Sequence, residues 1–280
     1  MTPADAVDLK ALVQSLLGPD EGEQALPSGR AGAGLASMLD PAGGVQLAEA
    51  LSHPPLPLAT SAISAYAPDT AQVERQIRRG LDALERRLRR TFDDAFKARY
   101  RLPGPSRCLD LLQESGALSE RNAKGKPLAK ALKKACRTLW APFGAFIETQ
   151  YKRARFDLRQ LRDDLGAALR ARGGDAARLE HLDGLLREAI RVEGERRYRR
   201  LLHALEQRFA TQIEALATEL TAQATVHDLE PAFGDDGPFA ELVRLGRSVV
   251  FSVMQHERAL LEGLMNVVTP AYDQRREGIH

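Results

Sequence analysis

Long stretches of this sequence space their apolar residues three and four positions apart, which is the period of an amphipathic α-helix. The first long stripe consists of Val73, Ile77, Leu81, Leu84, Leu88, Phe92 and Phe96. Similar stripes run through residues 128–172, 175–225 and 239–268. Leucine occurs 41 times, whereas valine and isoleucine together occur only 18 times. Because β-branched residues favour strands, we predict an all-α protein and not a sandwich, a barrel or a doubly wound sheet.

Proline and glycine divide the chain into four parts. Short apolar repeats predict a small N-terminal helical unit over residues 1–51. Residues 52–71, rich in Pro, Ser and Ala, are expected to form a linker. Residues 72–270 are expected to form an elongated bundle of long antiparallel helical hairpins, followed by a tail at 271–280.

Several local features of the long-helix region are also predicted. The first long helix is expected to start at Asp69-Thr70, and Gly173-Gly174 is expected to end the second. A short helical turn is predicted at 109–113. Residues 227–238 contain two prolines and two glycines, and we expect them to form a loop.

Charge is distributed unevenly, although the net charge is only +2. Residues 1–71 carry a net charge of −6, residues 72–210 a net charge of +14, and residues 211–280 a net charge of −6. A basic middle between acidic ends indicates either an external polyanionic partner or acidic ends that fold back on the basic helices.

No catalytic constellation is visible in the sequence. There is no P-loop, dinucleotide turn or Gly-x-Ser-x-Gly motif, and none of the six histidines lies three or four residues from another. Metal-ligand spacing is therefore absent, and we expect a non-enzymatic protein with neither metal nor cofactor. The two cysteines, Cys108 and Cys136, are expected to be reduced thiols of a cytosolic protein.

A membrane location is not expected. The chain does not open on a basic stretch followed by an apolar run, so we predict no signal peptide. The longest uncharged run, residues 50–68, contains four prolines and cannot form a membrane helix. We therefore expect a soluble, cytoplasmic protein.

One helix carries a cluster of basic residues that we single out as a candidate nucleic-acid-binding site. Its members are Lys126, Lys130, Lys133, Lys134 and Arg137. They fall on one side of the helix, with Leu128, Leu132 and Ala135 on the other, and no aromatic residue lies between them. Such a cluster favours contact with phosphates over base stacking. The alternatives are a solvated face, or a docking surface for an acidic segment of this chain or of a partner.

The apolar pattern of the third long helix lapses between Arg191 and Arg197, with Gly194 in the interval. A glycine there indicates either a kink or a contact with another chain. We take Arg191, Gly194 and Arg197 as a candidate partner interface. We expect a homo- or hetero-oligomer that covers apolar stripes which four long helices of one chain leave exposed.

The second half of the chain resembles a known family. The resemblance is carried by Phe146, Gln150, Leu158, Leu161-Arg162, Leu165, Leu169, Leu182-Asp183, Glu195, Leu205 to Phe209 and, near the N-terminus, by residues 28–51. The family is a proteobacterial group of all-helical cytosolic proteins. Its genes lie beside MotA/TolQ-like proton-channel genes and OmpA/MotB-like genes, as in type III Zorya anti-phage defence systems. The resemblance implies a cytosolic accessory or effector protein of an ion-driven membrane motor, with products of neighbouring genes as partners, and it supplies no catalytic residues.

Three functions follow as hypotheses. The first is a non-catalytic accessory protein of an ion-driven anti-phage system that binds a partner protein through residues 72–210, with DNA as a second candidate ligand of this region. The second is a purely structural helical adaptor or dimerisation protein. The third is an effector nuclease with a cryptic site, although such an enzyme needs several carboxylates that converge on a metal ion.

Overall fold

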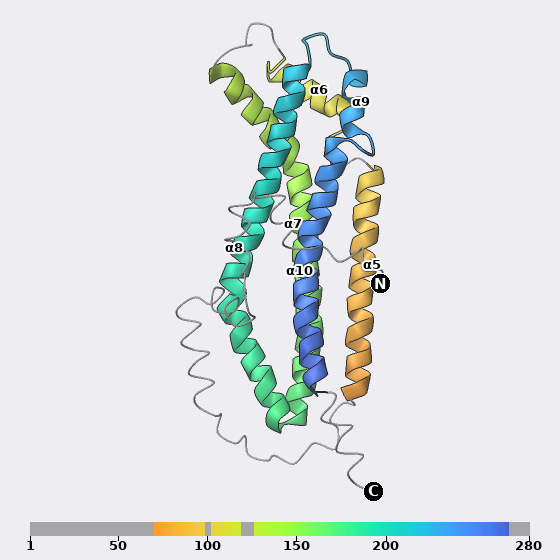
Figure 1. Ribbon diagram of the computed structural model, residues 1–280, viewed down its shortest axis with the longest axis vertical. Helices are drawn as coiled ribbons and strands as arrows, with labels where there is room; N and C mark the ends of the chain where they lie inside the picture. The colour runs from red at the N-terminus through yellow and green to blue at the C-terminus, as the bar shows by residue number, and fades with distance from the viewer. Residues whose placement is uncertain (1–69, 99–101, 119–125, 269–280) are drawn as a thin grey trace. The chain divides into compact units, whose positions relative to one another are not determined.

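The computed structural model describes residues 70–98, 102–118 and 126–268 (Figure 1). All its regular elements are helices: α5 (Thr70–Ala98), α6 (Pro105–Glu114), α7 (Lys126–Arg172), α8 (Gly174–Glu219), α9 (Val226–Phe233) and α10 (Pro238–Val268). No strand occurs in these described ranges, and the helices pack against each other, so the all-α prediction is confirmed. The predicted N-terminal unit, residues 52–69 of the predicted linker and the predicted tail lie outside the described residues.

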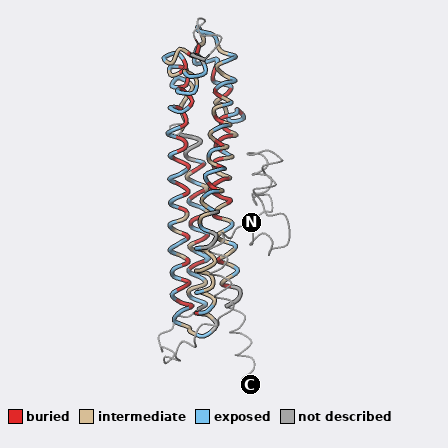
Figure 2. Tube along the Cα trace, turned by 90° about the vertical axis from the view of Figure 1, so that its left-hand side faces the viewer, coloured by how far each residue is buried: buried red, intermediate tan, exposed pale blue. Residues whose placement is uncertain are grey.

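The predicted apolar stripes form the buried faces of the helices. In α5 the side chains of Ile77, Leu81, Leu84, Leu88 and Phe92 are all buried. Figure 2 shows the same alternation of buried and exposed residues along the other long helices. Burial of these stripes stabilises helices that would be marginal in isolation, because most helical stability in proteins comes from tertiary packing.

The turn between α7 and α8 lies where the sequence predicts it. Gly173 and Gly174 have φ angles of 71° and 56°, in the left-handed region that glycine adopts without a steric penalty. α8 then ends at Glu219, six residues before the predicted end near Thr225.

The prediction of a loop at 227–238 is wrong, because α9 occupies Val226–Phe233. Thr225 and Asp228 form a capping box, in which the Asp228 carboxylate accepts a hydrogen bond of 2.7 Å from the Thr225 backbone N–H. Leu229 and Ala232 are buried. The capping box and the burial of Leu229 and Ala232 therefore stabilise α9 by more than Pro231 destabilises so short a helix.

The contacts divide the described residues into two compact units, where the sequence led us to expect one bundle over 72–270. Unit 1 consists of residues 88–98, 102–118, 126–152 and 199–251; unit 2 consists of residues 70–87, 153–198 and 252–268. Each long helix thus contributes a segment to both units.

Unit 1 has an aromatic core. Trp140 lies 5.5 Å from Phe143 and 5.6 Å from Phe209, measured between ring centroids, and Phe209 lies 5.7 Å from Phe239. These contacts join α7, α8 and α10. Phe92 of α5 adds an edge-to-face contact with Phe146 at 5.4 Å. Edge-to-face pairs of this kind add about 0.5–1.5 kcal/mol to the stabilisation from burial alone.

Unit 2 is held by close helix packing and by ion pairs. A Cβ atom at Gly80 of α5 would lie 2.5 Å from Leu161 Cδ2 of α7, so a larger residue at this position would require the Leu161 side chain to shift. Arg87, farther along α5, pairs with Asp157, which precedes Leu161 on α7. Since the partner on α7 moves toward lower numbers as the residue on α5 moves toward higher ones, α5 and α7 run antiparallel within this unit.

Candidate functional site

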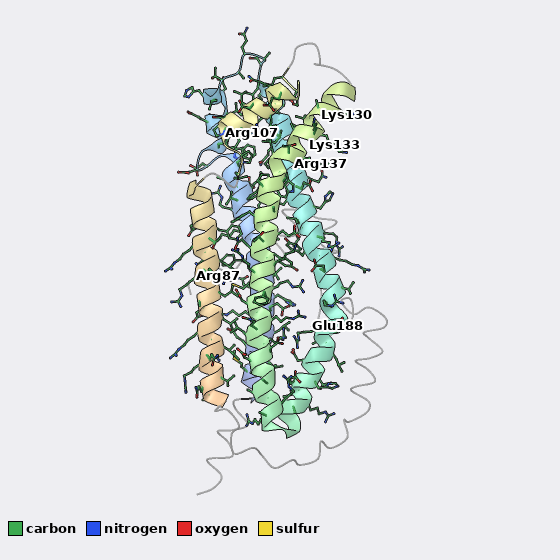
Figure 3. The ribbon with its side chains drawn as sticks, turned by 180° about the vertical axis from the view of Figure 1, so that it is seen from behind. Arg87, Arg107, Lys130, Lys133, Arg137 and Glu188 are labelled. Atoms are coloured by element: carbon green, nitrogen blue, oxygen red, sulfur yellow. The ribbon has the colours of Figure 1, made fainter. Side chains whose placement is uncertain are left out.

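The first turns of α7 carry a row of exposed basic side chains. Lys130, Lys133, Lys134 and Arg137 are all exposed, and we call these four residues the cationic ridge. They lie across the helix from Ala135, Cys136 and Leu139, which are buried. Figure 3 labels three of them, Lys130, Lys133 and Arg137, along the first turns of α7. Lys126 begins α7, and its side chain lies outside the described part of the structure.

No ion pair joins the ridge to any described carboxylate. Three arginines farther along α7 do form ion pairs. Arg155 pairs with Glu195 at 2.6 Å, Arg162 pairs with Asp183 at 2.8 Å, and Arg170 pairs with Glu180. The positive charge of the ridge is therefore not neutralised by a direct partner within the described chain, so it is accessible to an anion.

Arg107 on α6 adds a fifth exposed cation to this end of unit 1, and it was not among the predicted site residues. Arg107 and the ridge belong to the same compact unit. Figure 3 shows Arg107 on α6 near the end of unit 1 that carries the ridge. The sequence signal was available, because Cys108, Leu109 and Leu112 form the buried side of α6 and leave Arg107 on the other side.

The two cysteines do not provide a nucleophile. Both are buried and free. Burial, and to a lesser extent Cys136, raises the pKa of Cys108 to about 12. Burial, together with the negative charge of Glu214, raises the pKa of Cys136 to about 11. Both thiols are therefore protonated at neutral pH, whereas nucleophilic attack requires the thiolate.

The residues predicted as a partner interface lie on the segment of α8 in unit 2. Arg191 is exposed and donates hydrogen bonds of 2.9–3.1 Å to the carboxylate of Glu188, which lowers the pKa of Glu188. Gly194 is exposed, and a Cβ atom there would meet no neighbouring atom. Arg197 is half-buried and engaged in interactions of its own. α8 continues through Gly194 as helix, and the interface itself stays a prediction.

Metal and membrane sites were also sought in the part of the chain that the structure describes. No group of three or more His, Cys, Asp or Glu residues in it could hold a metal ion. Among the described helices, none combines the length and the apolar composition that a bilayer span requires.

Comparison with known proteins adds no relative. No model of a protein family, no curated protein and no solved structure matches the chain.

Proposed function

We propose that this protein is a non-catalytic accessory protein that binds the phosphate backbone of DNA through the cationic ridge. One observation carries the proposal: four exposed cations on one helix face have no ion-pair partner in the described chain, whereas Arg155, Arg162 and Arg170 farther along α7 are paired. The lysine and arginine side chains of the ridge would displace counterions that are condensed on the DNA phosphates, and the release of these ions supplies most of the affinity in sequence-independent binding.

The cationic ridge is suited to binding the phosphate backbone of DNA and not its bases. It carries no aromatic side chain on which a base could stack, and its lysines act as point charges without bidentate geometry. Binding through the ridge is therefore expected to depend weakly on sequence and strongly on salt.

The decisive experiment compares two double variants in the full chain. Lys130→Glu with Lys134→Glu removes two phosphate contacts and should flatten the plot of log affinity against log salt by about two units. Affinity for a labelled DNA duplex is measured by fluorescence anisotropy at several salt concentrations. Both side chains are exposed, so the fold should survive, as circular dichroism will check.

Arg86→Glu with Arg90→Glu is the matched control. These residues have the same spacing of four, are exposed on α5 and make no described ion pair, so the change in net charge is the same. The control should leave the salt slope nearly unchanged. Equal loss in both variants, or wild-type protein without salt-sensitive binding at low ionic strength, would contradict the proposal.

The competing function is a structural adaptor whose ridge docks an acidic segment of this chain or of a partner. The uneven charge of the chain favours this alternative, because the net charge of −6 on residues 1–71 and on 211–280 complements the basic middle. Under it, the change at Lys130 and Lys134 lowers complex formation or stability, while DNA binding stays at background in wild type and variant alike.

A place in an ion-driven anti-phage system, with a cytoplasmic location, is part of the same proposal and rests on the resemblance described above. Affinity purification of the full chain, expressed together with the products of its neighbouring genes, tests it. Recovery of a MotA/TolQ-like or OmpA/MotB-like protein in stoichiometric amounts is the expected result. If the chain is purified without either protein, the proposed place in an anti-phage system is wrong, and the DNA-binding proposal is unaffected.

A further inference from the structure

The outer side of α7 in unit 2 exposes a phenylalanine. Phe156 is 60% exposed, and Val226, at 37%, is the other large apolar side chain that the described residues expose. Ala154 and Leu158, two positions away on either side, are both buried. Since positions two apart on a helix point to roughly opposite sides, Phe156 projects away from the core of unit 2.

The helix is held firmly at this point. Arg155, just before Phe156, pairs with Glu195 of α8 at 2.6 Å, and Asp157, just after it, pairs with Arg87 of α5. The two pairs tie α7 to a neighbouring helix on each side. The ring is therefore presented on an ordered surface, which lowers the conformational entropy lost when a ligand binds.

Positive charge flanks the ring. Arg153 and Arg159 lie three residues before and after Phe156, on adjacent turns of the same face, and both are exposed. Neither makes a described ion pair. The charge of Arg159 reaches Glu188 of α8, but the hydrogen bonds of that carboxylate go to Arg191. Gln160, also exposed, adds an amide on the next turn.

We propose that Arg153, Phe156, Arg159 and Gln160 form a binding site for an unpaired nucleotide of single-stranded nucleic acid. The ring would stack on the base, the two guanidinium groups would contact the phosphates on either side, and the amide would bind a base edge. Stacking on an aromatic ring tolerates any base, because every base has a π face. The site spans about 10 Å of helix, because Gln160 lies seven positions after Arg153 and each position adds about 1.5 Å.

Two features favour a nucleic acid over a protein partner. An apolar anchor for a protein is normally surrounded by further apolar contacts, whereas the immediate neighbours on this face are charged or polar. The guanidinium groups also match the planar geometry of phosphate oxygens. Asp163 and Asp164, both exposed, limit the site at its far end, because they would repel further phosphates.

The test uses the full chain and two labelled probes: a decamer of thymidine, and a decamer of abasic sites that retains every phosphate. Phe156→Ala should weaken binding of the thymidine decamer about 5- to 100-fold, the range expected for loss of one stacked base. Binding of the abasic decamer should not change. Phe156→Trp, which retains a ring, should keep the affinity.

Three comparisons make the result decisive. Phe156→Leu keeps apolar bulk without the π system, so it should behave like Phe156→Ala; retention of affinity for the thymidine decamer would show that binding does not use base stacking, and would overturn the proposal. Val226→Ala, at the other exposed apolar side chain, should have no effect. Absence of any preference for thymidine over abasic sites in wild type would also overturn it.

This site does not depend on the cationic ridge, which belongs to unit 1. The effect of Phe156→Ala should persist when Lys130 and Lys134 are changed to Glu. If only the ridge variant loses affinity, the backbone-binding proposal survives and this one fails; if only Phe156→Ala loses affinity, the reverse holds.

Discussion

Arg162 is the most deeply buried charge of the described chain. Its side chain is 4% exposed and donates two hydrogen bonds to Asp183, of 3.0 and 2.8 Å, and one of 2.6 Å to Glu257. Asp183 also pairs with Arg187 at 3.2 Å. The network joins α7, α8 and α10 within unit 2. A buried guanidinium is tolerated because its donors are matched bidentately by a carboxylate.

Removing Arg162 should therefore be costly. Arg162→Ala removes the guanidinium group that donates hydrogen bonds to the carboxylates of Asp183 and Glu257. Breaking a buried pair in this way typically costs about 3–5 kcal/mol of unfolding free energy. Urea unfolding followed by circular dichroism measures the change.

Arg170→Ala provides the control on the same helix, because Arg170 pairs with Glu180 but is largely exposed. Exposed pairs contribute about 0–1 kcal/mol, so the unfolding midpoint should move little. Similar losses in the two variants would show that the buried network does not stabilise unit 2 more than a surface pair does.

At the scale of the element, α8 is held differently in its two segments. In unit 1 the side chains of Leu201, Leu205, Phe209 and Ile213 are buried. In unit 2 those of Leu179, Leu182, Leu185 and Leu186 are only half-buried. The pairs Arg155–Glu195, Arg162–Asp183 and Arg170–Glu180 attach this second segment to α7. Electrostatic attachment thus replaces much of the apolar burial found in unit 1.

This difference predicts unequal protection of backbone amides. Hydrogen exchange followed by mass spectrometry should be faster across residues 179–195 than across 201–213, because less apolar surface must be exposed to open the helix. Added salt should speed exchange in the first segment, where screening weakens the partly exposed pairs, and have a smaller effect on the second, which the Arg208–Glu241 pair joins to α10. Equal protection, or a salt effect of the same size in both segments, would contradict this account.

At the scale of the whole molecule, the expectation of an oligomer stays a prediction. Light scattering should give a mass above the 30.7 kDa of one chain, or a stable complex should form with the product of a neighbouring gene. The half-buried leucines of α8 in unit 2 are the surface that we expect to be covered, because burial of apolar side chains drives association.

A matched pair of variants locates that surface. Leu182→Ser with Leu186→Ser should shift the protein toward monomer. Leu216→Ser with Leu220→Ser, which removes two half-buried leucines of the same spacing from unit 1, should not. A wild-type protein that is monomeric and binds no neighbouring gene product would rule out the oligomer.

The sequence by itself determined what depends on neighbours along the chain. The stripe from Ile77 to Phe92 predicted which side of α5 is buried, and Gly173-Gly174 predicted where α7 ends. The exposure of Lys130, Lys133, Lys134 and Arg137 followed from the same helical period. Helical periodicity is a local property, so it can be read from one segment at a time.

Only the tertiary structure decided which charges are paired and which apolar residues are exposed. The sequence does not distinguish Arg162 from Arg153, because both lie in an arginine-rich helix. In the structure, Arg162 is buried against Asp183 and Arg153 is exposed. Phe156 is exposed although its type favours the interior, and α9 forms where Pro231 and Gly234 indicated a loop. These outcomes depend on which helices are neighbours and in what register, because a partner about 20 to 100 residues away supplies the deciding contact.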